Sequence, residues 1–371
     1  MKVLISGGGT GGHIYPAIAI ANAIKALVPE AEFLFVGAED RMEMQKVPQA
    51  GYAIIGLPIA GLQRGLSIGN IIKNLSFPFK LIRSLWKARA IVKGFKPDVA
   101  VGVGGYASGP MLWAATAAGV PALIQEQNSY AGLTNKLLAK RAKKICVAYD
   151  GMEKYFPAHK LVYTGNPVRK EIVNASLLKL PGLFEFKFAA DRKTILVIGG
   201  SLGARTINES IAEGLEKIRQ AGYQLIWQTG KSYFTTAQQL ASAGPRSNGW
   251  GDAKVYEFIG RMDLAYGVAD VVISRAGALS ITELCTAEKP CILVPSPNVA
   301  EDHQTKNAQA LANVQAAILV KDVDARATLV DTVLALLADE AKQNDLKTNI
   351  AALAKPDAAE VIAKQVIKLN S

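Results

Sequence analysis

The pattern of apolar and polar residues near the start of the chain predicts a strand, a tight turn and a helix. Residues 3–5 form a short apolar run, residues 7–12 hold five glycines and one threonine, and apolar residues then recur at helical spacing to residue 27. Residues 193–218 repeat this order, with the glycine turn GGSLGA. Because the repeat follows after about one domain's length, the sequence predicts two consecutive α/β domains.

Strand and helix patterns continue to alternate in both halves. Apolar runs that end in loops lie at residues 31–40, 97–105, 120–128 and 143–151, and again at 223–230, 253–260, 269–277 and 289–297. Such alternation predicts parallel sheets with right-handed crossovers. We expect the boundary near residues 165–167, where Gly and Pro cluster. Because ligands bind beyond the carboxyl ends of the strands, we expect the glycine turns of the two domains to line one cleft.

The composition suits this organisation. A chain of 371 residues can bury two cores, and a sequence that is 50% hydrophobic and 20% charged is typical of globular proteins. The three cysteines, Cys146, Cys285 and Cys291, form no CxxC pair, so we expect them to be reduced and buried, as in a cytosolic protein. Glycines interrupt the first apolar run too early for a signal peptide, and Gly and Pro residues divide the uncharged stretch 99–125 into strand, loop, helix and strand.

The positive charge is concentrated in the first part of the chain. Residues 1–149 carry 17 of the 42 basic residues and only 7 of the 31 acidic ones, and no acidic residue lies between Glu43 and Asp98. Within this gap, residues 73–93 mix apolar and cationic side chains, among them Phe77, Phe79, Lys80, Arg83, Trp86 and Lys87. The segment is either an amphipathic core helix with solvated lysines or a surface that docks on anionic lipid. The missing acids favour membrane docking, and no known motif supports nucleic-acid binding.

Each glycine turn would bind phosphate, because its free backbone N–H groups and the N-terminus of the following helix are directed at the same point. Gly7, Gly9 and Gly12 also satisfy GxGxxG, and Glu39 or Asp40 follows the next strand, so a dinucleotide-dependent oxidoreductase is the alternative function. Against this alternative, the second turn does not fit that pattern, and a second acid that could hold a ribose follows another glycine turn in the second half.

His13 stands directly after the last glycine of the first turn, which a dinucleotide site does not require. A helix N-terminus disfavours a cation, so we expect a neutral imidazole there that can accept a proton. His13 is therefore a candidate general base for a hydroxyl nucleophile. A histidine that only caps the turn through its own hydrogen bonds is the structural alternative.

Seven motifs together resemble one family. They are GGTGGHIYPA at 8–17, GGYASGP at 104–110, EQN at 126–128, GNPVR at 165–169, GGSLGA at 199–204, RAGALSITE at 275–283 and DHQTKNA at 302–308. They occur in order across nearly the whole chain and are similar to the bacterial lipid II-forming N-acetylglucosaminyltransferases, the MurG family. The resemblance implies a GT-B fold with an acceptor-binding, membrane-facing domain at 1–166, a UDP-sugar domain at 167–355, and a final helix at 356–371 that returns to the first domain.

The resemblance also implies roles for residues of the first domain. Thr10, Gly11 and Gly12 would lie near the donor sugar and phosphates, and Asn128 would reach the sugar. His13 would be the base for the muramoyl hydroxyl in an inverting displacement. The loop for the acceptor and its diphosphate would contain Gly104, Gly105, Tyr106, Ser108 and Gly109.

In the second domain, the resemblance implies that Arg169 and Ser201 contact the nucleotide and its diphosphate and that the backbone of Ile259 reads uracil. The phosphate turn would be lined by Ala278, Leu279, Ser280, Ile281 and Thr282. Glu283 would take the ribose hydroxyls, although an acid at this point also stabilises a helix dipole. Gln304, or a neighbour, would take the hexose hydroxyls.

The sequence departs from the family at Gln125, where the family often has His, which leaves the role of Gln125 open. No DxD-type carboxylate pair lies near a glycine turn, so we expect no metal, and no cofactor is implied. Helix N-termini and Arg169 would stabilise the charge on the departing UDP. The partners implied are UDP-N-acetylglucosamine, the undecaprenyl-linked muramoyl-pentapeptide, an anionic membrane surface and cell-wall synthesis proteins, at the cytoplasmic face of the bacterial membrane.

Overall fold

The computed structural model describes residues 1–59, 61, 77–200, 203–243, 252–299 and 302–370. The chain divides into two compact units. Met1–Val168 and Pro356–Ser371 form the first unit, and Arg169–Lys355 forms the second. Each unit has a parallel sheet with its own buried core.

In the described part of the first unit, seven parallel strands form one sheet in the order β3-β2-β1-β4-β5-β6-β7. The strands are β1 (Lys2–Ser6), β2 (Glu32–Ala38), β3 (Ile54–Leu57), β4 (Val99–Gly102), β5 (Ala122–Glu126), β6 (Lys144–Val147) and β7 (Leu161–Tyr163). The helices are α1 (Gly11–Leu27), α2 (Glu43–Gln49), α4 (Phe77–Phe95), α5 (Ser108–Ala117), α6 (Leu133–Leu138) and α16 (Ala358–Lys368).

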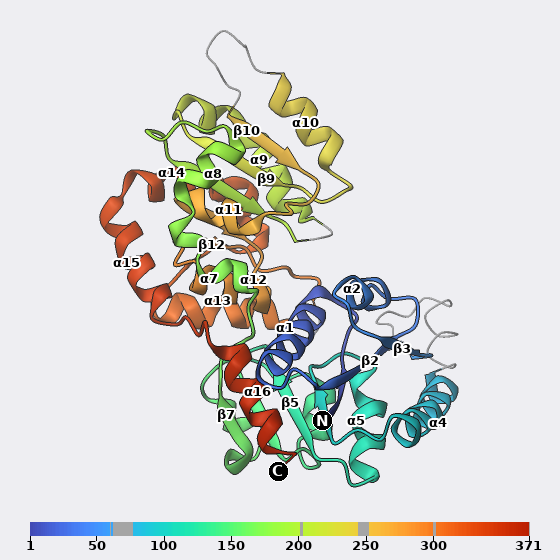
Figure 1. Cartoon of the computed structure of the whole chain (residues 1–371). Helices are drawn as coiled ribbons and strands as arrows, with labels where there is room; N and C mark the ends of the chain where they lie inside the picture. The colour runs from blue at the N-terminus through green and yellow to red at the C-terminus, as the bar shows by residue number, and fades with distance from the viewer. Residues whose placement is uncertain (60, 62–76, 201–202, 244–251, 300–301, 371) are drawn as a thin grey trace. The chain divides into compact units, whose positions relative to one another are not determined.

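The core of the first unit lies on both faces of this sheet. Along β1, Val3 and Leu4 belong to different core clusters and are fully buried, because successive side chains of a strand point to opposite faces. Helix α16, from the end of the chain, packs against α1, as Figure 1 shows. Its side chains Ile362 and Val366 are fully buried in the same cluster as Val3 and Ile14.

The second unit repeats the plan with a sheet of six described strands in the order β10-β9-β8-β11-β12-β13, all parallel. The strands are β8 (Thr194–Ile198), β9 (Gln224–Gln228), β10 (Ala253–Tyr256), β11 (Val271–Ser274), β12 (Cys291–Leu293) and β13 (Ile318–Leu319). The helices are α7 (Lys170–Val173), α8 (Lys179–Phe186), α9 (Arg205–Gln220), α10 (Phe234–Ser242), α11 (Met262–Val268), α12 (Ala278–Thr286), α13 (His303–Asn313), α14 (Ala325–Ala338) and α15 (Glu340–Ala351).

The strand order places both glycine turns where ligands bind in such sheets. Strand β1 pairs with β2 on one side and β4 on the other, and β8 pairs in the same way with β9 and β11. The order of the strands therefore reverses at β1 and at β8, and the turn after each strand lies at a topological switch point.

Several local predictions are confirmed. The stretch 99–125 folds as β4, a loop, α5 and β5, as predicted. A separate finding is that none of the described helices has the length and hydropathy that a membrane span requires. Cys146, Cys285 and Cys291 are buried and form no disulfide. Burial raises the pKa of Cys146 and of Cys285 to about 12, so neither thiol is a reactive nucleophile near neutral pH.

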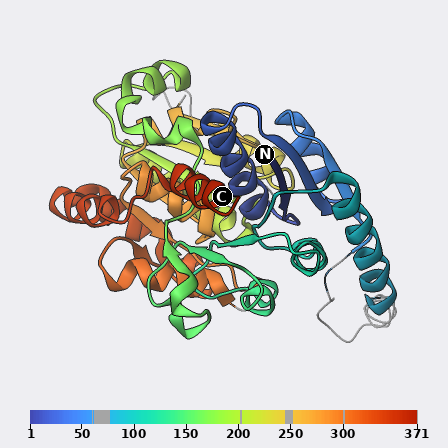
Figure 2. The same ribbon diagram turned by 60° about the horizontal axis from the view of Figure 1, so that its bottom comes forward.

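Of the segment 73–93, residues 73–76 lie outside the described residues, and the rest belongs to helix α4, which has a buried side and an exposed apolar side. Ala88 and Ile91 are buried against the first unit. On another side, Phe79, Ile82 and Trp86 follow each other at helical spacing and are 77%, 56% and 72% exposed. Figure 2 shows the helix at the edge of the unit, in teal. The helix is thus packed on one side and carries an apolar stripe on the other.

Candidate active site

The first glycine turn joins β1 to α1 and is closely packed. Gly8 and Gly9 have φ values of +151° and +89°, which favour glycine. A Cβ at Gly7 would overlap Val103, and one at Gly8 would overlap the carboxylate of Glu43. The turn therefore requires glycine both for its backbone angles and for the close approach of neighbouring side chains.

Glu43, at the start of α2, stabilises this turn through a backbone hydrogen bond. Its Oε2 accepts a hydrogen bond of 2.9 Å from the N–H of Gly9, and its Oε1 accepts one of 2.9 Å from the N–H of Ala38. The side chain is 1% exposed. Sequence reasoning missed this residue, because its partner Gly9 lies 34 positions away and only the fold brings them together.

Glu43 also bears on the oxidoreductase alternative. Its carboxylate already accepts a hydrogen bond from the N–H of Gly9, so that N–H is not available to a dinucleotide phosphate. Glu39, one of the two acids considered for a ribose, forms an ion pair of 2.9 Å with Lys87 instead. The geometry of this turn therefore does not favour a dinucleotide.

His13 lies in the first turn of α1, and its side chain is next to the loop that follows β4. Its backbone N–H donates to the carbonyl oxygen of Thr10 at 3.1 Å, and Thr10 is the extended N-cap of the helix. Its Nδ1 lies 3.2 Å from Oε1 of Gln127, which follows β5. A Cβ at Gly104 would lie 3.0 Å from Cε1 of the imidazole, so the ring packs against glycine backbone.

The loop after β4 contains the residues expected to meet the acceptor. Gly104 and Gly105 have φ values of +91° and +85°, and a Cβ at Gly105 would overlap the backbone of Gly8. Tyr106 is 50% exposed, whereas Ser108 is fully buried at the start of α5, which also contains Gly109. The two glycine-containing loops of this unit are thus in direct contact.

The loop after β5 is organised by Glu126, another residue that sequence reasoning gave no role. Its Oε1 accepts from the backbone N–H of Asn128 at 3.0 Å, and its Oε2 accepts from Nδ2 of Asn135 at 2.9 Å. Glu126 is 1% exposed. The first unit therefore gathers Thr10, Gly11, Gly12, His13, the 104–109 loop and Asn128 at the carboxyl ends of β1, β4 and β5.

In the second unit, the turn after β8 has a similar design. Gly200 and Gly203 have φ values of +76° and +80°, and a Cβ at Gly203 would overlap the carbonyl oxygen of Thr229. Ser201 lies outside the described residues. Gln228 donates through Nε2 to Gly200 O at 3.2 Å and accepts from the N–H of Ile259 at 3.0 Å. The side chain of Gln228 thus links the turn to the segment expected to read uracil.

Glu283, expected to hold a ribose, is buried on α12 and paired with Arg169. Its Oε1 accepts from Nε and Nη2 of Arg169 at 3.0 and 2.7 Å, and its Oε2 accepts from the hydroxyl of Tyr266 at 3.2 Å. Burial raises the pKa of Glu283, while Arg169 opposes that rise. Two residues that the sequence analysis assigned to different parts of the donor therefore form one ion pair, and sequence reasoning did not identify Tyr266.

The remaining candidates of the second unit lie on the first turns of two helices. Ala278, Leu279, Ser280, Ile281 and Thr282 begin α12 after the extended N-cap Gly277. The N–H of Ile281 already donates to Gly277 O at 2.9 Å. Gln304 lies at the start of α13, where its Oε1 accepts from the N–H of Ser296 at 2.9 Å.

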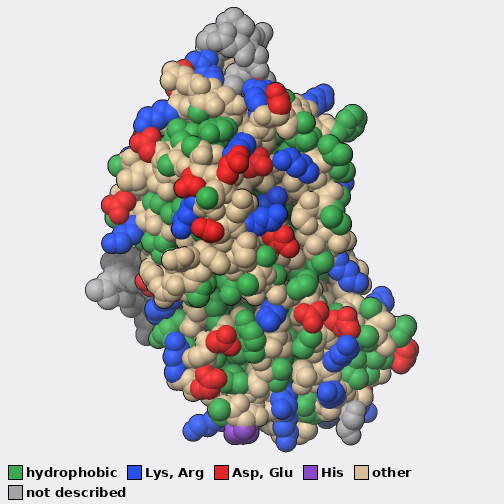
Figure 3. Space-filling view, turned by 90° about the vertical axis from the view of Figure 1, so that its left-hand side faces the viewer, with side chains coloured by type: hydrophobic (Ala, Val, Ile, Leu, Met, Phe, Trp, Pro, Cys, Tyr) green, Lys and Arg blue, Asp and Glu red, His purple; other side chains and the backbone are tan. Residues whose placement is uncertain are grey.

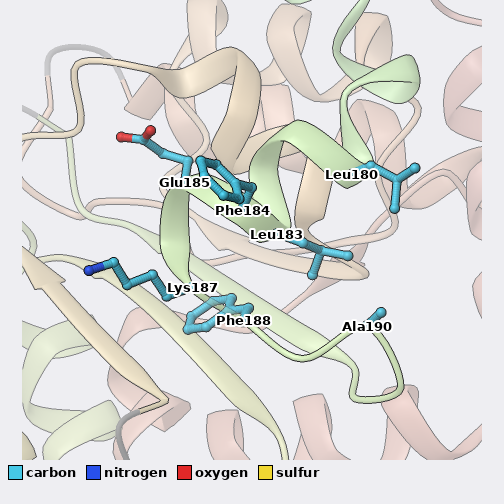
Figure 4. Close-up of a pocket in the computed structure, with 7 residues that line it drawn as sticks. All are labelled: Leu180, Leu183, Phe184, Glu185, Lys187, Phe188 and Ala190. Atoms are coloured by element: carbon cyan, nitrogen blue, oxygen red, sulfur yellow. The ribbon is translucent and has the colours of Figure 1, made fainter.

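Within the part of the chain that the structure describes, no group of three or more His, Cys, Asp or Glu side chains could hold a metal ion. A pocket of about 610 Å³ lies along and after α8, and Figure 4 shows its lining. Phe184 and Phe188 are among the residues that line it, and none of the residues singled out from the sequence lies there.

Comparisons with known proteins cover both units. Residues 3–147 match the family model described as "Glycosyltransferase family 28 N-terminal domain". Residues 194–362 match the model described as "Glycosyltransferase family 28 C-terminal domain". The chain is 58% identical to the UDP-N-acetylglucosamine–N-acetylmuramyl-(pentapeptide) pyrophosphoryl-undecaprenol N-acetylglucosamine transferase of Bacteroides thetaiotaomicron, over 100% of this chain and 98% of that one. The protein of that description from Flavobacterium psychrophilum is 52% identical, over 99% and 97%.

Solved structures agree with this match. MurG of Acinetobacter baumannii superposes with a TM-score of 0.77 at 29% identity, covering 99% of each chain. A UDP-GlcNAc 2-epimerase of Neisseria meningitidis has a TM-score of 0.68 at 15% identity, over 99% of this chain and 100% of that one, and shows a likeness of fold alone. The expected GT-B fold with two Rossmann-like domains is confirmed. None of these matches supports an oxidoreductase.

Proposed function

The chain belongs to glycosyltransferase family 28, and from this premise we propose that it completes lipid II for peptidoglycan synthesis. It transfers N-acetylglucosamine from UDP-N-acetylglucosamine to the C4 hydroxyl of the muramoyl residue in undecaprenyl-pyrophosphoryl-N-acetylmuramoyl-pentapeptide, with inversion at the anomeric carbon. The observation that carries this proposal is the 58% identity, over the whole chain, to a protein described by that activity.

In this reaction the first unit binds the acceptor and supplies the base. His13 takes the proton of the muramoyl hydroxyl as the hydroxyl oxygen attacks the anomeric carbon. The support is its place at the head of α1, with its ring against Gly104 of the acceptor loop. Thr10, Gly11 and Gly12 of this turn contact the donor sugar and its phosphates, and Asn128, next to Gln127 in the chain, contacts the sugar.

The second unit binds the nucleotide and stabilises the leaving UDP. The start of α12 presents backbone N–H groups and the positive end of a helix dipole, which suit a diphosphate without a metal. Glu283 accepts hydrogen bonds from the ribose hydroxyls and is held in place by Arg169 and Tyr266. Because the N–H of Ile259 donates to Gln228, the carbonyl oxygen of Ile259 is the group proposed to read uracil.

We also propose that α4 docks the protein on the anionic cytoplasmic surface of the membrane, as a peripheral protein. The exposed stripe of Phe79, Ile82 and Trp86 enters the lipid interface, while Lys80 and Arg83 on the same helix are exposed and meet the headgroups. The structure changes one part of the sequence argument, because Lys87 is paired with Glu39 and adds less to the attraction. By contrast with α4, the face of the molecule that Figure 3 shows carries acidic and basic side chains mixed together.

The direct test is incubation with labelled UDP-N-acetylglucosamine and the undecaprenyl-linked muramoyl-pentapeptide in anionic vesicles. We expect a labelled lipid-linked disaccharide and release of UDP that depends on the acceptor. UDP release at the same rate without the acceptor would contradict the proposed acceptor. A fluorescence titration with NADH serves as the contrast, and saturable binding there would support the oxidoreductase instead.

A further inference from the structure

A buried chain of side-chain amides runs from Asn166 to His13 in the first unit. Asn166 Oδ1 accepts from Gln125 Nε2 at 2.8 Å, and Gln125 Oε1 accepts from Gln127 Nε2. The other end of the Gln127 amide, Oε1, lies 3.2 Å from Nδ1 of His13. Gln125, Gln127 and Asn166 are 0%, 2% and 3% exposed. Bulk water does not reach these amides, so their hydrogen bonds must come from other protein groups.

Backbone carbonyl oxygens fix the direction of every hydrogen bond in this chain. Gln127 Nε2 donates to Val103 O at 2.7 Å, and Asn166 Nδ2 donates to Gln127 O at 3.0 Å. A carbonyl oxygen only accepts, so the atoms that face these two oxygens must be nitrogens. Flipping Gln127 or Asn166 would place two acceptors against each other, and Gln125 is fixed because it lies between them.

This direction determines which imidazole nitrogen of His13 carries the proton. The amide oxygen of Gln127 only accepts, so Nδ1 must donate to it. In a neutral imidazole with a protonated Nδ1, the basic lone pair is on Nε2. We propose that Gln127, oriented by Gln125 and Asn166, is a positioning residue that holds neutral His13 in the Nδ1–H tautomer and makes Nε2 the proton acceptor of the transfer reaction.

The inference rests on the proposed function, since it assigns the atom of His13 that acts there. The muramoyl O–H bond breaks and its proton goes to Nε2, while the new bond from oxygen to the anomeric carbon forms and UDP leaves with the electron pair. The resulting imidazolium keeps its Nδ1–H bond to Gln127. A neutral amide orients the ring without the attraction that a carboxylate exerts on a cation.

The tautomer is read directly by long-range ¹H–¹⁵N correlation spectra of the full-length protein labelled with ¹⁵N-histidine, at a pH where the ring is neutral. The chain has three histidines, and the signal that disappears in His13→Gln identifies the ring. We expect Nε2 to resonate as an unprotonated nitrogen and Nδ1 as a protonated one. The reverse assignment in the wild type overturns the proposal, whatever the variants do.

Two variants separate positioning from a merely structural role. Gln127→Met removes the acceptor at similar volume, and we expect mixed tautomers and a kcat lower by about tenfold or more, with the KM for UDP-N-acetylglucosamine within twofold. Gln127→Glu keeps an oxygen next to Nδ1, so we expect the Nδ1–H tautomer to persist, with the second carboxyl oxygen protonated because it faces the acceptors Val103 O and Gln125 Oε1. The exposed Gln45→Met is the matched control.

An unchanged His13 tautomer in Gln127→Met overturns the proposal. Failure of the proposed function is distinguishable from this outcome. If His13→Ala keeps near-normal turnover, His13 is not the base, yet the spectrum of the wild type still decides the tautomer. If His13→Ala is inactive and the wild type shows a protonated Nε2, only the tautomer proposal fails.

Discussion

Removing the carboxylate of Glu43 should destabilise the first unit around its glycine turn. In Glu43→Ala, the buried N–H of Ala38 and the partly buried N–H of Gly9 lose their acceptor. An unsatisfied buried donor costs about 1–3 kcal/mol, and the removed side chain leaves space that the turn cannot fill without moving. The variant no longer buries a charged carboxylate, which offsets part of this cost. We therefore expect the free energy of opening β1 and β2 to fall by about 3 kcal/mol.

Glu43→Gln should cost less, about 1–2 kcal/mol, because the amide keeps one acceptor but turns its NH₂ group toward the second N–H. Native-state hydrogen exchange measured by mass spectrometry on peptides from residues 2–6 and 32–38 reports this unit separately from the other. A loss of 3 kcal/mol corresponds to exchange about 150-fold faster. The exposed Glu30→Ala is the control, and Glu43→Ala exchange within threefold of wild type would refute the reasoning.

Three further predictions test other parts of the account. Glu283→Ala should weaken UDP binding by about 10- to 100-fold, because the ribose hydroxyls lose a charged acceptor, and calorimetry that gives an unchanged affinity defeats the ribose assignment. Replacing Lys80 and Arg83 by Glu should reduce partition onto anionic liposomes by at least about 30-fold, since each cation near the surface contributes about 1 kcal/mol. Burial lowers the pKa of Lys289 to about 8, so stability should rise by about 1 kcal/mol between pH 7 and 9, and Lys289→Met should lose this rise in urea titrations.

The sign for Lys289 follows from proton counts. As pH rises through 8, the native lysine loses its proton while the unfolded lysine keeps its own until about pH 10.4, so the unfolded state binds more protons and the free energy of unfolding rises. For the membrane variant, the control is replacement of Lys231 and Lys347 by Glu, which changes the net charge equally in the second unit. Equal loss of partition in both variants would show general electrostatics rather than docking through α4.

The parts of the fold that depend on neighbouring residues could be predicted from the sequence. The apolar runs that precede the two glycine turns fold as β1 and β8, because apolar residues before a glycine turn and a helix leave few other structures. The position of His13 at the head of α1 was likewise local. Membership of a GT-B family followed from several motifs in order rather than from any single one.

The contacts that hold the candidate site together could not be predicted, because they join residues far apart in the chain. Glu43 reaches the turn 34 positions away, and Arg169 meets Glu283 across 114 positions. The sequence gap in acidic residues suggested free cations on α4, yet the fold brings Glu39 to Lys87. Gln125, whose role the sequence left open, lies in the middle of the buried amide chain. Such pairings follow from strand order, which single-sequence patterns do not specify.

The central claim is that His13 accepts the proton of the attacking hydroxyl. The most direct measurement compares wild type with His13→Ala in acceptor-dependent UDP release, alongside the Kd for UDP-N-acetylglucosamine of each protein. We expect a kcat for His13→Ala that is lower by about 10²- to 10⁴-fold, with an unchanged Kd. A kcat for His13→Ala within tenfold of wild type would contradict it.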